Sequence, residues 1–260
     1  MHHLIIKTFT LMTMFILFST NLLAQDNSQE LELINIAAKQ RMLSQRIAKD
    51  YLYVHKNIAM SRTERELETS LKNFFESLKF LVQAIKNEEI NNILEFVELS
   101  SNDFNQTINK PFTLDNAQLV LDLSESMLEG SQYVVDSLKN SINIEESKII
   151  EIAGKQRMLA QRIAKYYIAY QAGIKDDNTV RSMRQTVTEF DKNLKVLIVY
   201  KSNTPIIRKK INEVNRLWKI VHKFYNNIEK GGLPLIVFNT TDKITKKMNE
   251  ITQIYLSVHK

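Results

Sequence analysis

The sequence predicts an all-α protein that consists of a tandem-duplicated, up-down four-helix bundle with about eight helices. Three observations support this fold class. The 260 residues include only 5 glycines and 3 prolines, apolar residues recur at helical spacing, and one motif occurs twice. Neither glycine-rich phosphate-binding consensus is present, so Rossmann and P-loop enzymes are excluded. The lack of cysteine excludes disulfides, iron–sulfur clusters and thiol catalysis.

The N-terminal segment, residues 1–24, has the layout of a signal peptide. Lys7 precedes a short apolar run at 9–18, and the small residue Ala24 precedes a polar stretch. A run of this length is shorter than a membrane-spanning helix, so we expect cleavage after Ala24 and no stable span in the mature protein. The alternative is an uncleaved anchor over residues 4–23. In either case the chain is expected to face the periplasm or the exterior.

The most informative feature is an internal repeat. Residues 34–53 and 150–169 are identical at 14 of 20 positions, at an offset of 116. The offset is nearly half of the chain, which indicates duplication of a whole unit. We therefore expect a first repeat at 28–143 and a second at 144–260.

The first repeat divides into four helical segments, at about 29–57, 61–85, 89–109 and 113–141. Ser61 and Glu64 have the spacing of a capping box, and Pro111 separates the last two segments. The sequence therefore predicts a side-chain cap at Ser61.

The second repeat follows the same plan. Its motif helix runs to about residue 171, and helices follow at about 180–200, from Pro205, and after Pro234. Thr204 precedes Pro205 in the order of cap then proline, Gly173 suits a C-terminal cap, and Asn143 with Glu146 forms another cap-like pair. Short loops predict antiparallel neighbours, so either each repeat forms a bundle or the two merge into one longer bundle.

The motif helix is expected to bury two faces and not one. One apolar stripe contains Leu33, Ile36, Leu43, Ile47 and Tyr51. The opposite face also mixes small and apolar residues with an arginine and an amide: Ala38, Arg41, Met42, Gln45 and Leu52 in the first copy, and Gly154, Arg157, Met158, Gln161 and Ile168 in the second.

The natural partner for this second face is the same face of the other copy, which brings Arg41 and Arg157 together. Two guanidinium groups repel each other, and an oxyanion between them would relieve the repulsion. The candidate ligand-binding residues are Arg41, Arg157, Ala38, Gly154, Met42, Met158, Gln45 and Gln161. The alternative is that the arginines only pack and form salt bridges.

Other polar residues of the motif are expected to have structural roles. We expect Gln40 and Gln156 to form hydrogen bonds within the bundle. The remaining cations are expected to be solvated or paired; they are Lys39, Arg46, Lys49, Lys155, Arg162 and Lys165.

The two copies, QRMLSQRIAK at 40–49 and QRMLAQRIAK at 156–165, resemble the motif helices of PilJ-type sensor domains, the N-terminal domains of type IV pili methyl-accepting chemotaxis proteins. They are also similar to the P-box of NarX-type nitrate/nitrite sensors, in which one arginine from each of two chains holds a nitrate. The resemblance implies a helical bundle in which Arg41 and Arg157 correspond to that arginine, and Ala38 and Gly154 to the small residue before it. Alanine at 38 in place of glycine is a departure.

We therefore expect a periplasmic small-ligand sensing protein, with a nitrate-like oxyanion as the first candidate ligand, that lacks an output domain of its own. It would act in chemotaxis-like signal transduction through a membrane receptor or a homodimer. The alternative is a structural helical module that docks or dimerises without a ligand. No catalytic group, metal site or cofactor is expected, because the histidines are isolated and the acidic doublets lie at helix starts. The net charge of +6 is spread with both signs along the chain, so no nucleic-acid partner is expected.

Overall fold

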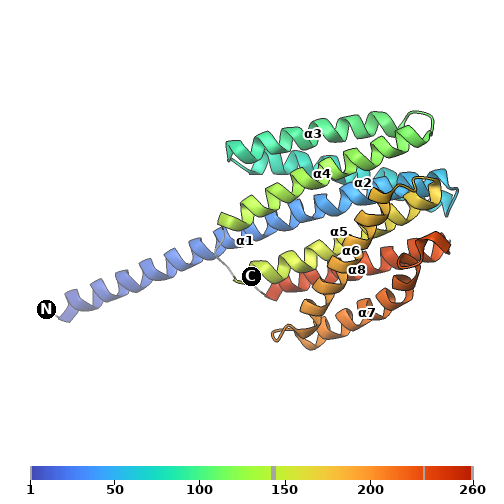
Figure 1. The fold of residues 1–260 in the computed structure, drawn as a ribbon. Helices are drawn as coiled ribbons and strands as arrows, with labels where there is room; N and C mark the ends of the chain where they lie inside the picture. The colour runs from blue at the N-terminus through green and yellow to red at the C-terminus, as the bar shows by residue number, and fades with distance from the viewer. Residues whose placement is uncertain (1, 142–144, 231, 259–260) are drawn as a thin grey trace.

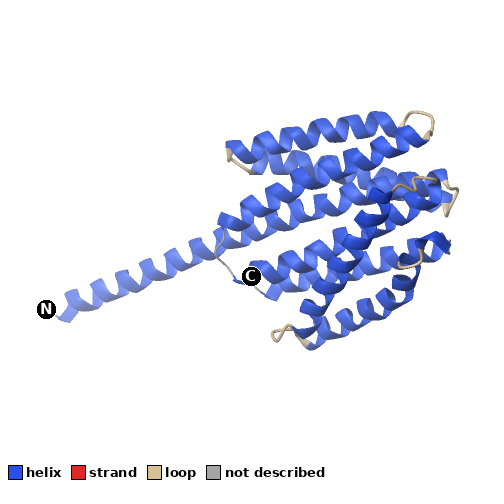
Figure 2. Cartoon of the chain, viewed as in Figure 1, coloured by secondary structure: helices blue, strands red, loops and turns tan. Residues whose placement is uncertain are grey.

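The computed structural model describes residues 2–141, 145–230 and 232–258, and regular structure within these ranges is entirely helical (Figure 2). The eight α-helices are α1 His2–His55, α2 Met60–Ala84, α3 Glu88–Ile108, α4 Leu114–Ser141, α5 Glu145–Ala172, α6 Asp177–Val199, α7 Pro205–Tyr225 and α8 Pro234–Val258. A short 3-10 turn lies at Ile228–Lys230. The predicted all-α class is confirmed.

The helices form two four-helix groups that meet along one seam. Helices α1 to α4 form one group and α5 to α8 the other, and α1 lies beside α5 at the centre (Figure 1). Helix α1 also packs against α2 and α4, whereas α5 packs against α6 and α8. The motif helices therefore each have neighbours on two sides, as the two apolar faces predicted.

The seam is close because small residues face each other across it. A Cβ atom placed on Gly154 of α5 would lie 3.5 Å from the Cβ of Ala38 on α1, which is ordinary van der Waals contact. Around this point almost every motif residue is buried, including Ala37, Ile47 and their copies. The small residues thus allow the backbones of α1 and α5 to approach each other closely.

Several helix ends follow their sequence signals. The Thr204 hydroxyl accepts a hydrogen bond from the backbone N–H of Ile207, and Pro205 occupies the first turn of α7. Gly173 follows α5 with a φ of 115°, a left-handed conformation that favours glycine. These local signals set the ends of the helices to within a few residues.

The beginnings of two helices differ from the prediction. Helix α1 starts at His2 and not near residue 29, and continues beyond the bundle on its N-terminal side (Figure 1). The capping box at Ser61 is wrong: α2 starts at Met60, after Asn57 and Ala59 adopt φ values of 54° and 50°. Because this left-handed turn places the helix start ahead of Ser61, its hydroxyl provides no cap. The predicted cap at Asn143 lies outside the described residues.

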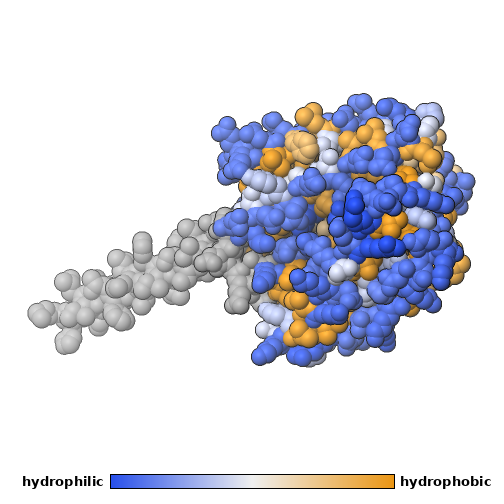
Figure 3. Space-filling view, viewed as in Figure 1, coloured by the Kyte–Doolittle hydropathy of each residue, from blue (hydrophilic) through white to orange (hydrophobic). Residues whose placement is uncertain are grey.

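The surface is mostly hydrophilic on the face shown in Figure 3, where hydrophobic patches are separate from one another. Inside the second group, Trp218 is buried and its ring centroid lies 4.2 Å from that of Phe190, so it belongs to the core. Within the described residues no helix combines the length and the apolar character that crossing a bilayer requires.

Candidate functional site

The two motif arginines lie buried at the α1–α5 seam. The side chain of Arg41 is 0% exposed and that of Arg157 is 1% exposed. Burial of a guanidinium group is costly unless its charge and its N–H donors find partners. The partners of each arginine therefore decide what the seam can do chemically.

Arg41 has a carboxylate partner. Its Nη1 donates to Gln132 Oε1 on α4 at 2.5 Å and lies 3.3 Å from Glu151 Oε1 on α5. Its Nε and Nη2 are buried without a hydrogen-bond partner. The charge of Arg41 is thus compensated, while part of its donor capacity is unused.

Arg157 has only neutral partners. Its Nη1 donates to Asn249 Oδ1 on α8 at 2.8 Å, Nη2 donates to Asn35 Oδ1 on α1 at 3.1 Å, and Nε donates to the Gly154 carbonyl at 3.3 Å. Among the described residues, no carboxylate lies within ion-pair distance of it. Three of its five N–H donors are engaged, which leaves two for a ligand.

The two arginines are related by the repeat, but their contacts differ in charge. Arg41 contacts Glu151 across the seam and Arg157 contacts Asn35, and positions 35 and 151 are themselves equivalent in the two copies. Burial, together with the positive charge of Arg41, lowers the pKa of Arg157 to about 9. The seam therefore contains one compensated guanidinium and one uncompensated guanidinium within electrostatic range of each other.

The motif glutamines that face the bundle bind mostly to helices α4 and α8. Gln45 Nε2 donates to the Ser124 carbonyl at 2.9 Å, and Gln161 Nε2 donates to Thr245 Oγ1 at 2.8 Å. Gln156 Nε2 donates to the Phe190 carbonyl at 3.0 Å, as expected of a bundle hydrogen bond. Its copy Gln40 is fully buried with neither amide atom bonded, so the corresponding expectation for Gln40 is wrong.

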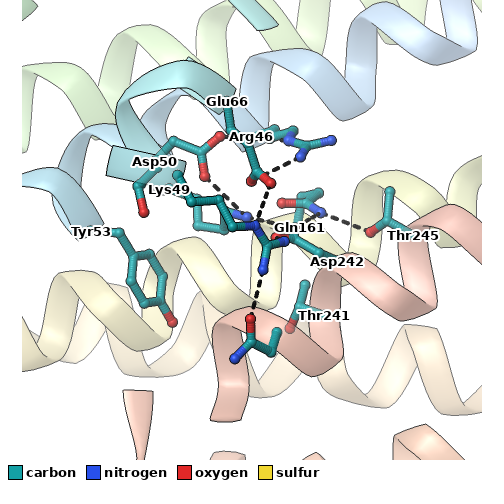
Figure 4. A network of polar contacts seen from close by, with 12 residues as sticks. Arg46, Lys49, Asp50, Tyr53, Glu66, Gln161, Thr241, Asp242 and Thr245 are labelled. Carbon is teal, nitrogen blue, oxygen red and sulfur yellow. Dashed lines mark hydrogen bonds and ion pairs between the residues drawn. The ribbon is translucent and has the colours of Figure 1, made fainter. Parts of the chain in front are cut away.

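The motif cations beyond the arginine pair enter ion-pair networks. In the network of Figure 4, Lys49 Nζ lies 2.8 Å from Asp242 Oδ1 and 3.1 Å from Asp50 Oδ1. Arg46 and Arg62 both contact Glu66, and Arg62 also contacts Asp242. Lys49 was expected to be either solvated or paired. It is paired, and it is fully buried.

The related network joins α5 to α4. Lys165, which is fully buried, forms an ion pair with Glu125, and Arg162 Nη2 lies 2.5 Å from the other oxygen of Glu125. Lys155 is paired with Glu189 at 2.5 Å. Both copies of the motif thus direct a buried lysine to the fourth helix of the opposite repeat.

The carboxylates of these networks titrate differently. Burial raises the pKa of Asp50 to about 6, against the opposing effect of Lys49 and Arg46. Burial acts in the same direction on Glu125, but Lys165 and Arg162 outweigh it and hold its pKa at about 2. The pKa of Asp242 is likewise lowered, because Lys49 and Arg46 outweigh its desolvation.

Two grooves flank the seam at equivalent places. The first, here called the basic groove, has a volume of about 410 Å³ and is lined by α1, α2 and α8, with Arg157 reaching into it. The second, here called the acidic groove, has a volume of about 440 Å³ and is lined by α5, α4 and α6. Met42 lines the first and its copy Met158 lines the second. Arg157 lines the basic groove, whereas Arg41 lines neither of the two grooves.

Some of these features were missed at the level of sequence. The difference between Arg41 and Arg157 follows from Asn35 and Glu151, which are among the few positions where the two copies differ. A comparison of the differing positions, and not of the identical ones, would have pointed to it. Asp242 carries no motif and lies 193 residues from Lys49, so no sequence signal linked the two.

Comparison with known proteins gives a partial match. Residues 140–237 match the family model PilJ, described as the type IV pili methyl-accepting chemotaxis transducer N-terminal domain. The matched range begins at the end of α4, spans α5 to α7 and ends at the start of α8, and so contains the second motif copy. No curated protein and no solved structure matches the chain. The match supports a PilJ-type sensor domain at these residues and suggests a sensory or signal-transduction module, since the matched family is one of chemotaxis transducers and not of enzymes.

Proposed function

We propose that the protein is an extracytoplasmic sensory module that binds a small oxyanion at the α1–α5 seam and acts through a membrane receptor. Arg157 is the principal binding group, Arg41 lies beside it, and Ala38 and Gly154 let the two helices approach closely. The flanking grooves are lined by Met42 and Met158. Beside them, Gln45 and Gln161 form hydrogen bonds to α4 and α8. The match to a chemotaxis transducer domain supports the receptor context.

The observation that carries the proposal is the buried, uncompensated guanidinium of Arg157. A buried cation is stable only if its charge is satisfied, and amide oxygens satisfy the hydrogen bonds of Arg157 without neutralising it. An oxyanion that accepts hydrogen bonds from the two free N–H groups of Arg157 would supply the missing negative charge. Such charge-assisted hydrogen bonds are short and strong, and the guanidinium fork suits carboxylate, nitrate and phosphate alike.

The test is calorimetric titration of the protein with nitrate, sulfate and phosphate, combined with thermal unfolding. Arg157→Ala should lower the affinity of the anion that binds by about 10- to 150-fold, because one charge-assisted interaction worth roughly 1.5–3 kcal/mol is lost. Arg157→Lys should also weaken binding, because the bidentate fork is lost. An anion that binds the folded protein should raise the melting temperature of the wild type, and the increase should grow with the logarithm of the anion concentration.

Two further variants make the test specific. Glu151→Gln removes the carboxylate partner of Arg41, so a second guanidinium becomes available and the affinity should rise. Arg208→Ala, an arginine on α7 far from the motif in the chain, is the matched control and should leave binding unchanged. If no oxyanion shifts the melting of the wild type, or if the double variant Arg41→Ala, Arg157→Ala responds as the wild type does, the proposal fails and a docking or dimerising module takes its place.

A further inference from the structure

The two grooves are structural copies of each other. The motif helices correspond at an offset of 116, and α4 corresponds to α8 at an offset of 117, at which the buried residues Ser124, Met127 and Val134 match the buried Thr241, Ile244 and Ile251. A residue that lines one groove can therefore be compared with its counterpart in the other. The comparison shows which groove is equipped for an anion.

The basic groove contains cations without counter-ions. Lys39 on α1 and Lys243 and Lys246 on α8 are exposed, and among the described residues none forms an ion pair or hydrogen bond with their ammonium groups. Arg157 at the inner end has no carboxylate partner either. The other two cations of the groove, Arg46 and Arg62, are already paired with Glu66 and its neighbours. Four positively charged groups of this groove thus have no ion-pair partner within the described residues.

At the equivalent positions of the acidic groove each of these charges is either paired with a carboxylate or absent. The counterpart of Lys39 is Lys155, which is paired with Glu189 at 2.5 Å. The counterparts of Lys246 and Lys243 are Glu129 and Ser126. The counterpart of Arg157 is Arg41, whose charge Glu151 compensates. The duplicated backbone therefore presents a site for an anion on one side of the seam only.

The size and floor of the basic groove indicate the kind of anion. Its volume of about 410 Å³ lies within the range of sites that hold organic molecules, and it is far larger than a four-atom oxyanion needs. Met42 and Thr245, which are 6% and 5% exposed, form a buried floor that suits a carbon skeleton. Asn249, beside Arg157, adds amide donors at the inner end.

We propose that the basic groove binds an organic anion with two or more negatively charged groups, one of them at Arg157 and the others near Lys39, Lys243 and Lys246. This inference rests on the proposed function at Arg157 and names the ligand class of that site. Polycarboxylates and phosphorylated compounds share this chemistry. One ligand is expected per chain, because the acidic groove repels it.

The experiment is calorimetric titration at low ionic strength with citrate, fructose 1,6-bisphosphate and nitrate, the last as a monovalent reference. Low salt is needed because the attraction of exposed lysines is screened beyond about 10 Å at 0.1 M. We expect citrate or fructose 1,6-bisphosphate to bind at least 10-fold more tightly than nitrate, with one site per chain. Which of the two binds more tightly distinguishes a carboxylate ligand from a phosphate ligand.

The variants copy residues of the acidic groove into the basic groove. Lys246→Glu and Lys243→Ser should each lower the affinity of the organic anion, the first by about 10-fold, and should change that of nitrate by about threefold or less. Lys201→Glu, an exposed position in the α6–α7 turn, makes the same charge change outside both grooves and should have no effect. Glu129→Lys, in the acidic groove, should likewise leave the first binding event unchanged.

The outcomes separate this inference from the proposed function. If nitrate binds through Arg157 and neither organic anion binds more tightly, or if Lys246→Glu has no effect on the organic anion, the inference is overturned and the proposed function stands. If the organic anion binds through Lys246 but Arg157→Ala leaves its affinity unchanged, the proposed site at Arg157 fails, and with it the placement of the ligand. If none of the three anions binds, both fail.

Discussion

Lys49 and Lys165 occupy the same position in the two motif copies, and both are fully buried, yet their charges are balanced differently. Lys49 lies between two carboxylates, Asp50 and Asp242, whereas Lys165 contacts a single carboxylate among the described residues, that of Glu125. The extra carboxylate arises at position 50, whose counterpart in the second copy is Tyr166. A single difference between the repeats, aspartate or tyrosine at this position, thus changes the number of carboxylates beside the buried lysine.

The difference shows that the number of nearby charges, and not the backbone, sets the behaviour of these buried groups. Arg46, Lys49 and Arg62 share three carboxylates in the first network, so Asp50 gains too little attraction to offset its burial, and its pKa rises to about 6. In the second network Lys165 and Arg162 share a single carboxylate, so the pKa of Glu125 falls to about 2. Asp50, which has no acidic counterpart in the second repeat, is therefore placed unfavourably, whereas Glu125 is placed favourably.

The largest expected effect comes from the favourable carboxylate. Glu125→Gln should destabilise the protein by about 3–4 kcal/mol at pH 7, because the lowered pKa of Glu125 is lost and Lys165 is left buried without a charge partner. The contribution of a carboxyl group with a lowered pKa is present above its ordinary pKa and disappears as the pH falls toward 2. Urea unfolding at pH 7 and pH 3 measures it, and the difference between variant and wild type should shrink at pH 3. A loss below about 1 kcal/mol at pH 7 would contradict the comparison.

The unfavourable carboxylate should give the opposite result. Asp50→Asn should stabilise the protein by about 2–3 kcal/mol at pH 7.5, because ionised Asp50 costs free energy in the fold that a neutral amide does not. The pKa of Asp50 is raised from 3.8 to about 6, so this cost applies fully above pH 6 and vanishes as the pH falls toward 4. The groups facing it are Lys49, Arg46, Asp242 and Glu66. Urea unfolding of variant and wild type across pH 4 to 7.5 checks the sign, and a destabilised variant at pH 7.5 would refute it.

The smallest effect concerns the seam, where glycine and alanine face each other. Gly154→Ala should stabilise the helix by about 0.5–1 kcal/mol, because alanine is the better helix former and its Cβ would meet Ala38 at an ordinary distance. The same Cβ would lie 3.2 Å from Nη2 of Arg157, so the guanidinium must shift and anion binding should weaken. Thermal unfolding and calorimetry on one preparation test both parts. The reverse change, Ala38→Gly, is the matched control and should lower stability by a similar amount.

The fold was largely predictable because its signals are local. Thr204, Pro205 and Gly173 act on backbone groups within a few residues of themselves, and so they predicted helix ends correctly. The cap predicted at Ser61 was wrong because Ala59, an alanine with no sequence signal for it, adopts a left-handed conformation directly before α2; Asn57, a residue type that favours this conformation, adopts it as well. Neither residue is glycine, and the tight turn imposes their conformation.

The candidate site was predictable only in part. Sequence periodicity placed Arg41 and Arg157 on faces that meet at the seam, since the projection of a helix depends on spacing alone. The partners that make the two arginines different come from other helices, as Asn249 and Gln132 do from α8 and α4. No periodicity within one helix can reveal which side chain of a distant helix it will meet.

The crossed lysines have a consequence for how the chain unfolds. Lys49 belongs to the first group of helices but is paired with Asp242 in the second, and Lys165 belongs to the second but is paired with Glu125 in the first. If one group melted alone, it would leave a charged residue of the other without its counter-ion inside a packed core. Each half therefore depends on the other for charge neutrality. Although each repeat resembles a complete bundle, we therefore expect the two to unfold together in one transition.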